Sequence, residues 1–303
     1  MKKKGYIRYT EKRVKFFSFL FLLLTKNNIA VIIPKETETN MQTKIFSFAS
    51  AFLLVLSLCV SVGARGEAIG WYCARNKEHK QPMFDERLSY VEKYGGYYID
   101  KRHGDENAER VVYLTFDAGY ENGNVERILD VMKAENVKGA FFILGNLISK
   151  NPELVRRMAD EGHIVCNHTN RHRDMTTVRS VEEFRTELES LELLYREKIG
   201  EEMAKYYRPP EGRFSEETMR YASELGYKTI FWSFAYADWD NAKQPSPEAA
   251  KKKILDNIHN GAVILLHPTS ATNAEILGDV VRELKRQGYR FGTLDELTTE
   301  AEG

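Results

Sequence analysis

Polar side chains that can carry acid–base or metal chemistry follow five apolar segments of this 303-residue sequence. They include carboxylates, imidazoles and one guanidinium. A carboxylate can act as a general base, and an imidazole can act as a general acid or a zinc ligand. Together these groups predict metal-assisted hydrolysis of an acyl group. The residues are Asp117, His168, His172, Arg208, Asp238 and His267.

Each of these residues also has a simpler interpretation. Asp117 could cap the helix predicted after it, and two histidines four residues apart also occur on solvated loops. Arg208 could be a surface residue before a proline turn, and His267 a histidine at a strand edge. Their occurrence together at the ends of five predicted strands favours the catalytic interpretation, because sites in parallel α/β folds lie at the carboxyl ends of strands.

Seven short segments rich in Val, Ile, Phe and Tyr predict the strands that position these residues. Amphipathic helices are predicted between them, with start signals at Asn151-Pro152, Ser246-Pro247, Ser180 and Thr272. Seven such units in about 190 residues favour an α/β barrel over a long open sheet. The predicted strands span residues 111–117, 139–144, 163–169, 205–210, 228–234, 262–267 and 289–294.

The N-terminal part of the chain predicts export. Residues 45–64 are uncharged and apolar, follow Lys44 and end in small residues, as in a secretory signal that starts at Met41. An uncleaved membrane anchor is the alternative, since 20 apolar residues can span a bilayer. We interpret residues 1–40 as a doubtful extension, 41–64 as signal or anchor, 65–105 as an arm packed on the barrel, and 106–303 as the catalytic domain.

Charge and cysteine content limit the classes of partner. Residues 1–64 carry a net charge of +7 and the remainder −7, so the body has no general attraction for nucleic acid. Hydrophobic residues make up 43% of the chain, which is typical of a globular protein. Cys73 and Cys166 could form one disulfide or remain two free thiols. The oligomeric state is left open.

Five motifs, in order, resemble those of polysaccharide deacetylases of the NodB-homology type, carbohydrate esterase family four. The similarity covers about residues 105–300 and implies a distorted (β/α)₇ barrel and a hydrolase that acts on the amide bond of N-acetyl groups. The matching segments are Thr-Phe-Asp at 115–117, His-x₃-His at 168–172, Arg-x-Pro-x-Gly at 208–212, Asp-Trp at 238–239 and Leu-x-His at 265–267.

The resemblance implies a role for each matching residue. Asp117 would be the general base and Arg208 would orient it; His267 would protonate the leaving amine and Asp238 would orient it. His168 and His172 would hold a divalent metal ion, zinc in first place. Leu265 and Trp239 would wall the acetyl pocket, and the main-chain N–H of Tyr207 or of a neighbouring residue would help to stabilise the oxyanion.

One position departs from the family pattern. A second Asp, which is a metal ligand, usually follows the base, and this chain has Ala118 there. Two histidines without a third ligand are expected to hold the metal weakly. An inactive wall-binding protein is therefore one alternative function, although a binding protein would not need two oriented acid–base groups.

The segments TFDAGYENG and RPPEGRFS are similar to those of a subgroup, the delta-lactam-forming muramic-acid deacetylases of spore-forming bacteria. This implies spore-cortex peptidoglycan as substrate, after an amidase has removed the peptide, and a location in the cell wall or the forespore intermembrane space. Arg75, Arg213 and Arg173 are candidates for binding the lactyl carboxylate, because Arg suits bidentate carboxylate recognition. A deacetylase of N-acetylglucosamine or of another polysaccharide is the second alternative.

Overall fold

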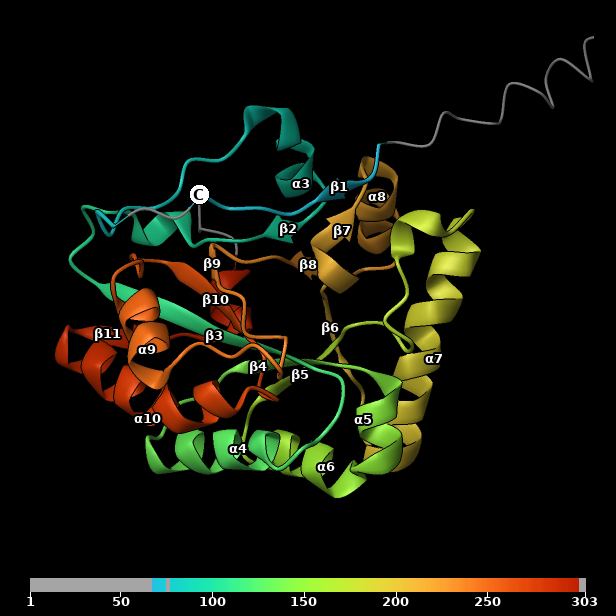
Figure 1. The fold of residues 1–303 in the computed structure, drawn as a ribbon. Coiled ribbons are helices and arrows are strands. Elements are labelled where there is room, and N and C mark those ends of the chain that lie inside the picture. Colours follow the sequence, from blue (N-terminus) through green and yellow to red (C-terminus); the bar gives the residue numbers. More distant parts are fainter. Residues whose placement is uncertain (1–66, 75–76, 300–303) are drawn as a thin grey trace, which may run out of the picture. The chain divides into compact units, whose positions relative to one another are not determined.

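The computed structural model describes residues 67–74 and 77–299 (Figure 1). The predictions for residues 1–40 and 41–64, and that for Arg75, lie outside the described residues. Within the described ranges, no helix is both long enough and apolar enough to cross a membrane.

A curled parallel sheet of nine strands forms the centre of the fold, with helices around its outer face (Figure 1). This agrees with the predicted distorted (β/α)₇ barrel, and each of the seven predicted strands is present at least in part. The strands, in spatial order, are β2 (Gly96–Tyr97), β8 (Lys228–Ile230), β6 (Ala204–Tyr207), β5 (Ile164–Asn167), β4 (Ala140–Ile143), β3 (Arg110–Ala118), β10 (Ala262–Leu266) and β9 (Phe234–Ala235), with β11 (Tyr289–Phe291) paired to the start of β3.

The predicted strand 228–234 is the one that the structure corrects. It divides into β8 and β9, which lie near opposite ends of the sheet. Between them, the Phe231 amide donates to the Tyr97 carbonyl at 2.7 Å and the Ser233 amide donates to the Val263 carbonyl at 3.0 Å. Within three residues the chain thus leaves β8, near one end of the strand order, and joins β9, the last strand at the other end. The continuous apolar run did not indicate this break.

The helices begin largely at the predicted signals. Ser180 and Ser246 accept hydrogen bonds from the amides of Glu183 and Ala249, as expected of N-caps. The prediction for Thr272 was wrong: Ser270 caps that helix, and the Thr272 hydroxyl donates to the Pro245 carbonyl instead. The helices are α3 (Tyr90–Lys93), α4 (Asn124–Ala134), α5 (Gly145–Lys150), α6 (Pro152–Asp160), α7 (Val181–Ile199), α8 (Glu216–Glu224), α9 (Pro247–Leu255), α10 (Ala271–Arg286) and α11 (Leu294–Leu297), with 3₁₀ turns at Glu86–Leu88, Lys101–His103, Met175–Thr177 and Pro210–Gly212.

Strand β3 separates two apolar layers because alternate side chains of a strand point to opposite faces. Val112, Leu114, Phe116 and Ala118 belong to the large cluster that the outer helices cover. Val111 and Tyr113 belong to a smaller cluster on the inner face of the sheet. Asp117 continues the inner row, so the sheet carries this carboxylate towards the inside of the barrel.

The segment predicted as an arm contributes strands to two sheets. Strand β1 (Ile69–Gly70) pairs antiparallel with β7 (Arg213–Phe214), and β2 extends the main sheet beside β8. The ring of Trp71 stacks on Phe231 with centroids 4.3 Å apart, and its indole N–H donates to the Trp232 carbonyl at 2.8 Å. These contacts attach the arm to the connection between β8 and β9.

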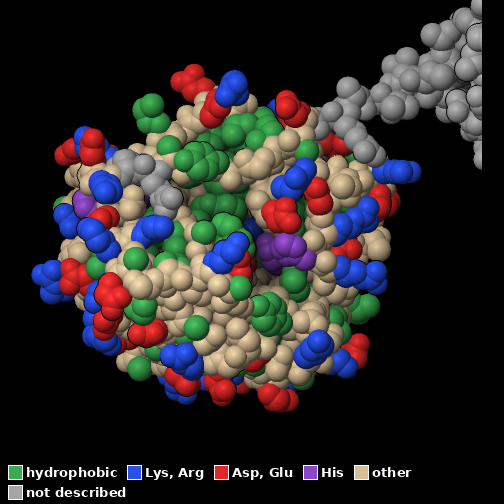
Figure 2. All heavy atoms as spheres, in the orientation of Figure 1, with side chains coloured by type: hydrophobic (Ala, Val, Ile, Leu, Met, Phe, Trp, Pro, Cys, Tyr) green, Lys and Arg blue, Asp and Glu red, His purple; other side chains and the backbone are tan. Residues whose placement is uncertain are grey.

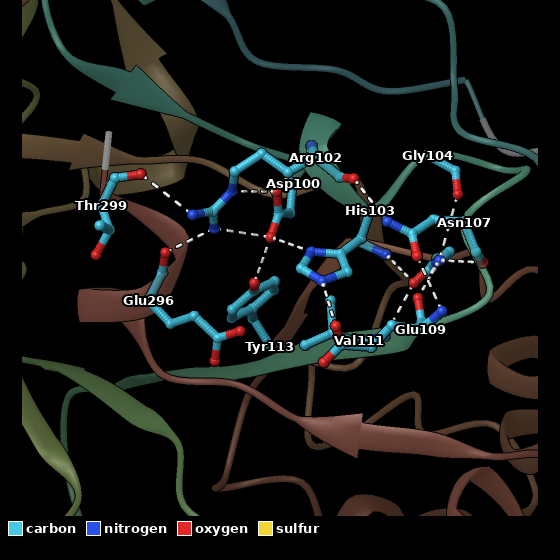
Figure 3. Close-up of polar contacts among 12 residues, drawn as sticks. Asp100, Arg102, His103, Gly104, Asn107, Glu109, Val111, Tyr113, Glu296 and Thr299 are labelled. Carbon is cyan, nitrogen blue, oxygen red and sulfur yellow. Dashed lines mark hydrogen bonds and ion pairs between the residues drawn. The ribbon is translucent and has the colours of Figure 1, made fainter. Parts of the chain in front are cut away.

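A buried carboxylate joins the arm to the amino-terminal end of β3 (Figure 3). Asp100 accepts two hydrogen bonds from the Arg102 guanidinium, one from His103 and one from the hydroxyl of Tyr113. Burial alone would raise the pKa of Asp100, but these four donors lower it to about 2. The cluster is therefore an ionic contact that stabilises the fold at neutral pH.

The two described cysteines are free thiols, so the disulfide alternative is excluded in this structure. Cys73 donates to the Trp232 carbonyl at 3.2 Å, and burial raises the pKa of its thiol to about 12. Cys166 is buried in the inner cluster on β5. Neither thiol is poised to be a nucleophile, because burial opposes formation of the thiolate.

Candidate active site

A pocket of about 630 Å³ opens at the carboxyl ends of the strands. On the face drawn in Figure 2, histidine side chains border a hollow lined by hydrophobic side chains. The pocket combines two carboxylates, three imidazoles and several aromatic rings, as ligand sites with a few fixed polar groups do. Its lining residues are Asp117, Gly119, Tyr120, Leu144, His168, His172, Glu211, Gly212, Trp232, Ala235, Tyr236, Trp239, Leu265, His267 and Thr269.

Asp117 forms an ion pair with Arg208 on one side of this pocket. The Arg208 Nη1 atom donates to Asp117 Oδ1 at 2.8 Å, and the other carboxylate oxygen lies 3.5 Å from His168 Nε2. Burial would raise the pKa of Asp117, but Arg208, His168 and His267 together hold it below its ordinary value. The carboxylate is therefore ionised at neutral pH, as a proton acceptor must be.

Arg208 is fully buried, and every part of its guanidinium has a fixed partner. It donates to the Ile230 carbonyl at 2.9 Å, to the Thr115 hydroxyl at 2.9 Å and to the Phe231 carbonyl at 3.3 Å, besides its bond to Asp117. The guanidinium also lies 4.0 Å from the ring centroid of Phe142. These contacts hold the Asp117 carboxylate in one place, because its partner cannot move.

His168 and His172 lie next to each other where the chain leaves β5. Their ring centroids are 5.1 Å apart, and both line the pocket. His168 Nδ1 donates to the Arg208 carbonyl at 2.9 Å, which leaves the lone pair on Nε2. Burial lowers the pKa of His168 to about 4, so the imidazole is neutral at pH 7.

These two imidazoles fit a divalent metal ion, but the set of donors is incomplete. A neutral imidazole whose other nitrogen donates to a carbonyl is the arrangement that metal-bound histidines use. However, the described residues include no cluster of three or more His, Cys, Asp or Glu side chains arranged to hold a metal. Ala118 is fully buried in the outer apolar cluster and supplies no donor.

Asp238 and His267 form a second pair on the pocket. The Asp238 carboxylate accepts hydrogen bonds from His267 Nδ1 at 2.7 Å, from the His267 amide at 2.8 Å and from Asn273 Nδ2 at 2.7 Å. Burial lowers the pKa of His267, but the hydrogen bond and the charge of Asp238 outweigh it, so that the pKa lies above the ordinary value. The imidazole is therefore a proton donor near neutral pH.

The structure brings most of the predicted residues together. Asp117, His168, His172 and His267 line the pocket with the predicted walls Leu265 and Trp239, while the buried Arg208 and Asp238 contact pocket residues from behind. They come from segments spread over 151 positions of the chain. Their convergence results from parallel strands that all end at the same edge of the sheet.

Two candidates for binding the lactyl carboxylate, Arg213 and Arg173, do not line the pocket. The prediction for Tyr207 concerned its main-chain N–H, at the end of β6, and stays a prediction; the side chain packs in an apolar cluster with Phe184 and Tyr227. Arg213, which pairs with Asp174 at 3.0 Å, lies in β7. Arg173, another candidate for the lactyl carboxylate, pairs with Glu183 at 2.7 Å.

Sequence reasoning missed several residues of the site. Asn273 holds Asp238 from the first turn of α10, and its type and position gave no signal. Trp232 and Tyr120 line the pocket. Trp232 belongs to an apolar run that was interpreted as continuous strand, whereas Tyr120 could have been found, because it lies only three residues after Asp117 in the same loop.

Known proteins resemble this chain in both sequence and structure. The family model described as polysaccharide deacetylase matches residues 104–230. A Bacillus subtilis protein described as peptidoglycan-N-acetylmuramic acid deacetylase PdaA is 38% identical over 254 residues, which cover 84% of this chain and 94% of that protein. A Bacillus cereus peptidoglycan-N-acetylglucosamine deacetylase is 33% identical over 69% of this chain and 74% of its own length.

A solved structure gives the same result. The structure of Bacillus subtilis PdaA, described as a family 4 carbohydrate esterase, superimposes with a TM-score of 0.71 at 39% sequence identity. The match covers 76% of this chain and 97% of that chain. The similarity therefore extends over the whole barrel.

Proposed function

This chain belongs to the polysaccharide deacetylase family, and from that premise we propose that it removes the N-acetyl group of muramic acid in peptide-free peptidoglycan. It is a hydrolase of the amide bond in N-acetyl groups, and relatives of both kinds reported above act on peptidoglycan. The observation that carries the proposal is the pairing, in one pocket, of an arginine-held carboxylate with an aspartate-held imidazole.

In the proposed reaction Asp117 accepts a proton from the attacking water. Its carboxylate is ionised because the positive charge of Arg208 lowers its pKa. One of its oxygens faces His168. A fixed base of this kind accelerates a reaction by roughly 10²–10⁴-fold. Arg208 acts as a positioning residue, because it contacts the base and is itself buried.

His267 then donates a proton to the nitrogen of the sugar as the carbon–nitrogen bond breaks. Its Nδ1–H is bound by Asp238, so Nε2 is the atom that carries the transferable proton. Leu265 and Trp239 supply apolar lining for the acetyl methyl group. The products are acetate and the free amine.

A divalent ion is the cofactor we propose, since family members are generally metalloenzymes. His168 and His172 would hold it, and when bound it would polarise the acetyl carbonyl. With two protein ligands, its affinity is expected to be lower than that of a site with three.

The finer substrate assignment depends on the 38% identity to the muramic-acid deacetylase and on the segments that follow Asp117 and Arg208. The freed amine of muramic acid lies close enough to its own lactyl carboxyl to close a delta-lactam, once an amidase has removed the peptide. We assign this product to spore cortex and the enzyme to the exported compartment, which the apolar segment 45–64 supports. Deacetylation of N-acetylglucosamine is the second candidate, favoured by the similarity to the Bacillus cereus enzyme.

In the test, the full chain is incubated with Zn²⁺ and one of two substrates. These are peptidoglycan glycan stripped of peptide and an N-acetylglucosamine oligomer. Mass spectrometry should show acetyl loss from muramic acid, followed by loss of water on ring closure. The Asp117→Asn variant, with its fold checked by circular dichroism, should release no acetate. Acetyl loss from the glucosamine oligomer alone would assign the second candidate. No release from either substrate by a folded protein would support a wall-binding protein instead.

A further inference from the structure

Two exposed aromatic side chains line the catalytic pocket. In the described part of the chain five large hydrophobic side chains are exposed, and two of them are Tyr120, at 44%, and Trp239, at 62%. The side chains of Asp117 and His267 are only 10% and 24% exposed. The aromatic rings therefore lie at the mouth of the pocket, above the groups that react.

Tyr120 is fixed in place from across the pocket mouth. Its hydroxyl accepts a hydrogen bond from Asn241 Nδ2 at 2.7 Å, and Asn241 belongs to the loop that carries Asp238. The side chain of Gln244 donates to the main-chain carbonyls of Asp238 and Asp240 at 2.8 and 2.9 Å. These hydrogen bonds hold the loop of Asn241 in one conformation. Because the Tyr120 oxygen accepts from Asn241, its own O–H remains free to donate.

The other side of the Tyr120 loop is tied as well. Asn122 and Asn124 both donate to the Thr269 carbonyl, at 2.9 and 3.0 Å, just after His267. These hydrogen bonds on both sides of Tyr120 restrict the conformations of its side chain in the free protein. Such a ring contributes more to binding than a mobile one, because little entropy remains to be lost.

The chemistry of this pair fits a sugar ring. One face of a pyranose consists of C–H groups, which pack on an aromatic face, while its hydroxyl groups accept hydrogen bonds from a phenol. Exposed apolar side chains grouped at a functional pocket mark a binding surface. The sugar that reacts must reach Asp117 and His267 in the interior, so a ring at the mouth contacts the next sugar of the strand.

Resting on the function proposed above, we propose that Tyr120 forms a subsite for the sugar adjacent to the one that is deacetylated, while Trp239 borders the acetyl pocket beside it. Tyr120 is then a specificity-determining residue for chain length. It takes no part in proton transfer, and the enzyme prefers glycan strands to the single sugar N-acetylmuramic acid.

The experiment compares steady-state kinetics of the full chain on the monosaccharide N-acetylmuramic acid and on a peptide-free hexasaccharide of the glycan. For Tyr120→Ala we expect KM on the hexasaccharide to rise about tenfold, with kcat within about twofold and little change on the monosaccharide. Tyr120→Phe retains the ring and should stay within about threefold of the wild type. Tyr72→Ala is the matched control, since Tyr72 is 82% exposed and does not line the pocket.

Equal losses on both substrates, a fall in kcat alone, or no change in Tyr120→Ala would each overturn the subsite. If the wild type releases no acetate from either substrate, the proposed function fails, and calorimetry of hexasaccharide binding then tests the subsite by itself. Weaker binding by Tyr120→Ala than by Tyr72→Ala would support it, and equal binding would overturn it.

Discussion

Replacing Asp238 by Asn should change the pH dependence of the reaction more than it changes the fold. Asp238 is fully buried and accepts three hydrogen bonds, two from His267 and one from Asn273. The pKa of His267 is lowered by burial and raised by the hydrogen bond and charge of Asp238. Asn keeps the burial but removes the charge, so the pKa of His267 should fall below its ordinary value of about 6.5.

The direction of the change in activity follows from the role of His267. A proton donor is active while protonated, so the activity of the wild type should decline as pH rises through the raised pKa of His267. In Asp238→Asn this decline should occur at lower pH. At pH 7 we expect kcat to fall by about 10²–10⁴-fold, the usual contribution of a positioned acid. The decline on the acid side, which Asp117 controls, should stay where it is.

The cost in stability should be modest. An amide oxygen can still accept from one of the three donors, so we expect the free energy of unfolding to fall by about 1–3 kcal/mol. The assays are kcat/KM as a function of pH and urea unfolding. Asp240→Asn is the control, because Asp240 is exposed and its bond to the Ala242 amide survives the change. An alkaline decline at the same pH in Asp238→Asn and in the wild type would refute the assignment of His267 as the acid.

Three other changes test separate parts of the structure. Ala118→Asp places a carboxylate in the outer apolar cluster, so the melting temperature of this variant should drop without metal. Added Zn²⁺ should raise the melting temperature of the variant more than that of the wild type. An equal Zn²⁺ effect in both would mean that this position is not a metal ligand. Asp100→Asn removes a carboxylate whose pKa is lowered to about 2. This lowered pKa contributes about 2–3 kcal/mol to the free energy of unfolding, which is present above pH 4 and lost as pH falls towards 2. The free energies of unfolding in urea at pH 7 and pH 3 should therefore differ less in the variant than in the wild type, and an unchanged difference would contradict this. Gly212→Ala should reduce both the melting temperature and kcat, because Gly212 has a φ of +65° and a Cβ there would lie 2.6 Å from the ring of Trp232. A wild-type melting temperature and kcat would show that the turn Pro210–Gly212 tolerates the change.

Much of the fold could be predicted because its signals are local. The strands of a parallel sheet buried on both faces are short apolar runs, and the helices between them carry caps such as Ser180 and Ser246. The break after Ile230 could not be predicted, since Phe231 and Trp232 are as apolar as the strand before them. It depends on hydrogen bonds to Tyr97 and Val263, which are distant in sequence.

The site was predictable where a residue stands at a strand end. Asp117, Arg208 and His267 each follow an apolar run, so their meeting could be inferred from the topology of the sheet. The predicted role of Arg213 depended on which way its side chain points after the Pro210–Gly212 turn, and the sequence does not determine that direction. Asn273 was missed because it reaches Asp238 from the first turn of α10, and the sequence around it does not indicate a contact with the distant loop that carries Asp238.

The attachment of the arm to Trp232 has a consequence for the order in which the chain folds. Trp71 and its hydrogen-bond acceptor are 161 residues apart. At a synthesis rate of about 5–20 residues per second, the arm waits roughly 8–32 s before its partner exists. During that interval Trp71, Phe84 and Tyr98 can contact one another, but the distant rings of their cluster, Phe214 and Phe231, do not yet exist. The first part of the described chain to be synthesised is thus among the last to complete its native contacts, and this aromatic segment is where a nascent chain most needs protection from aggregation.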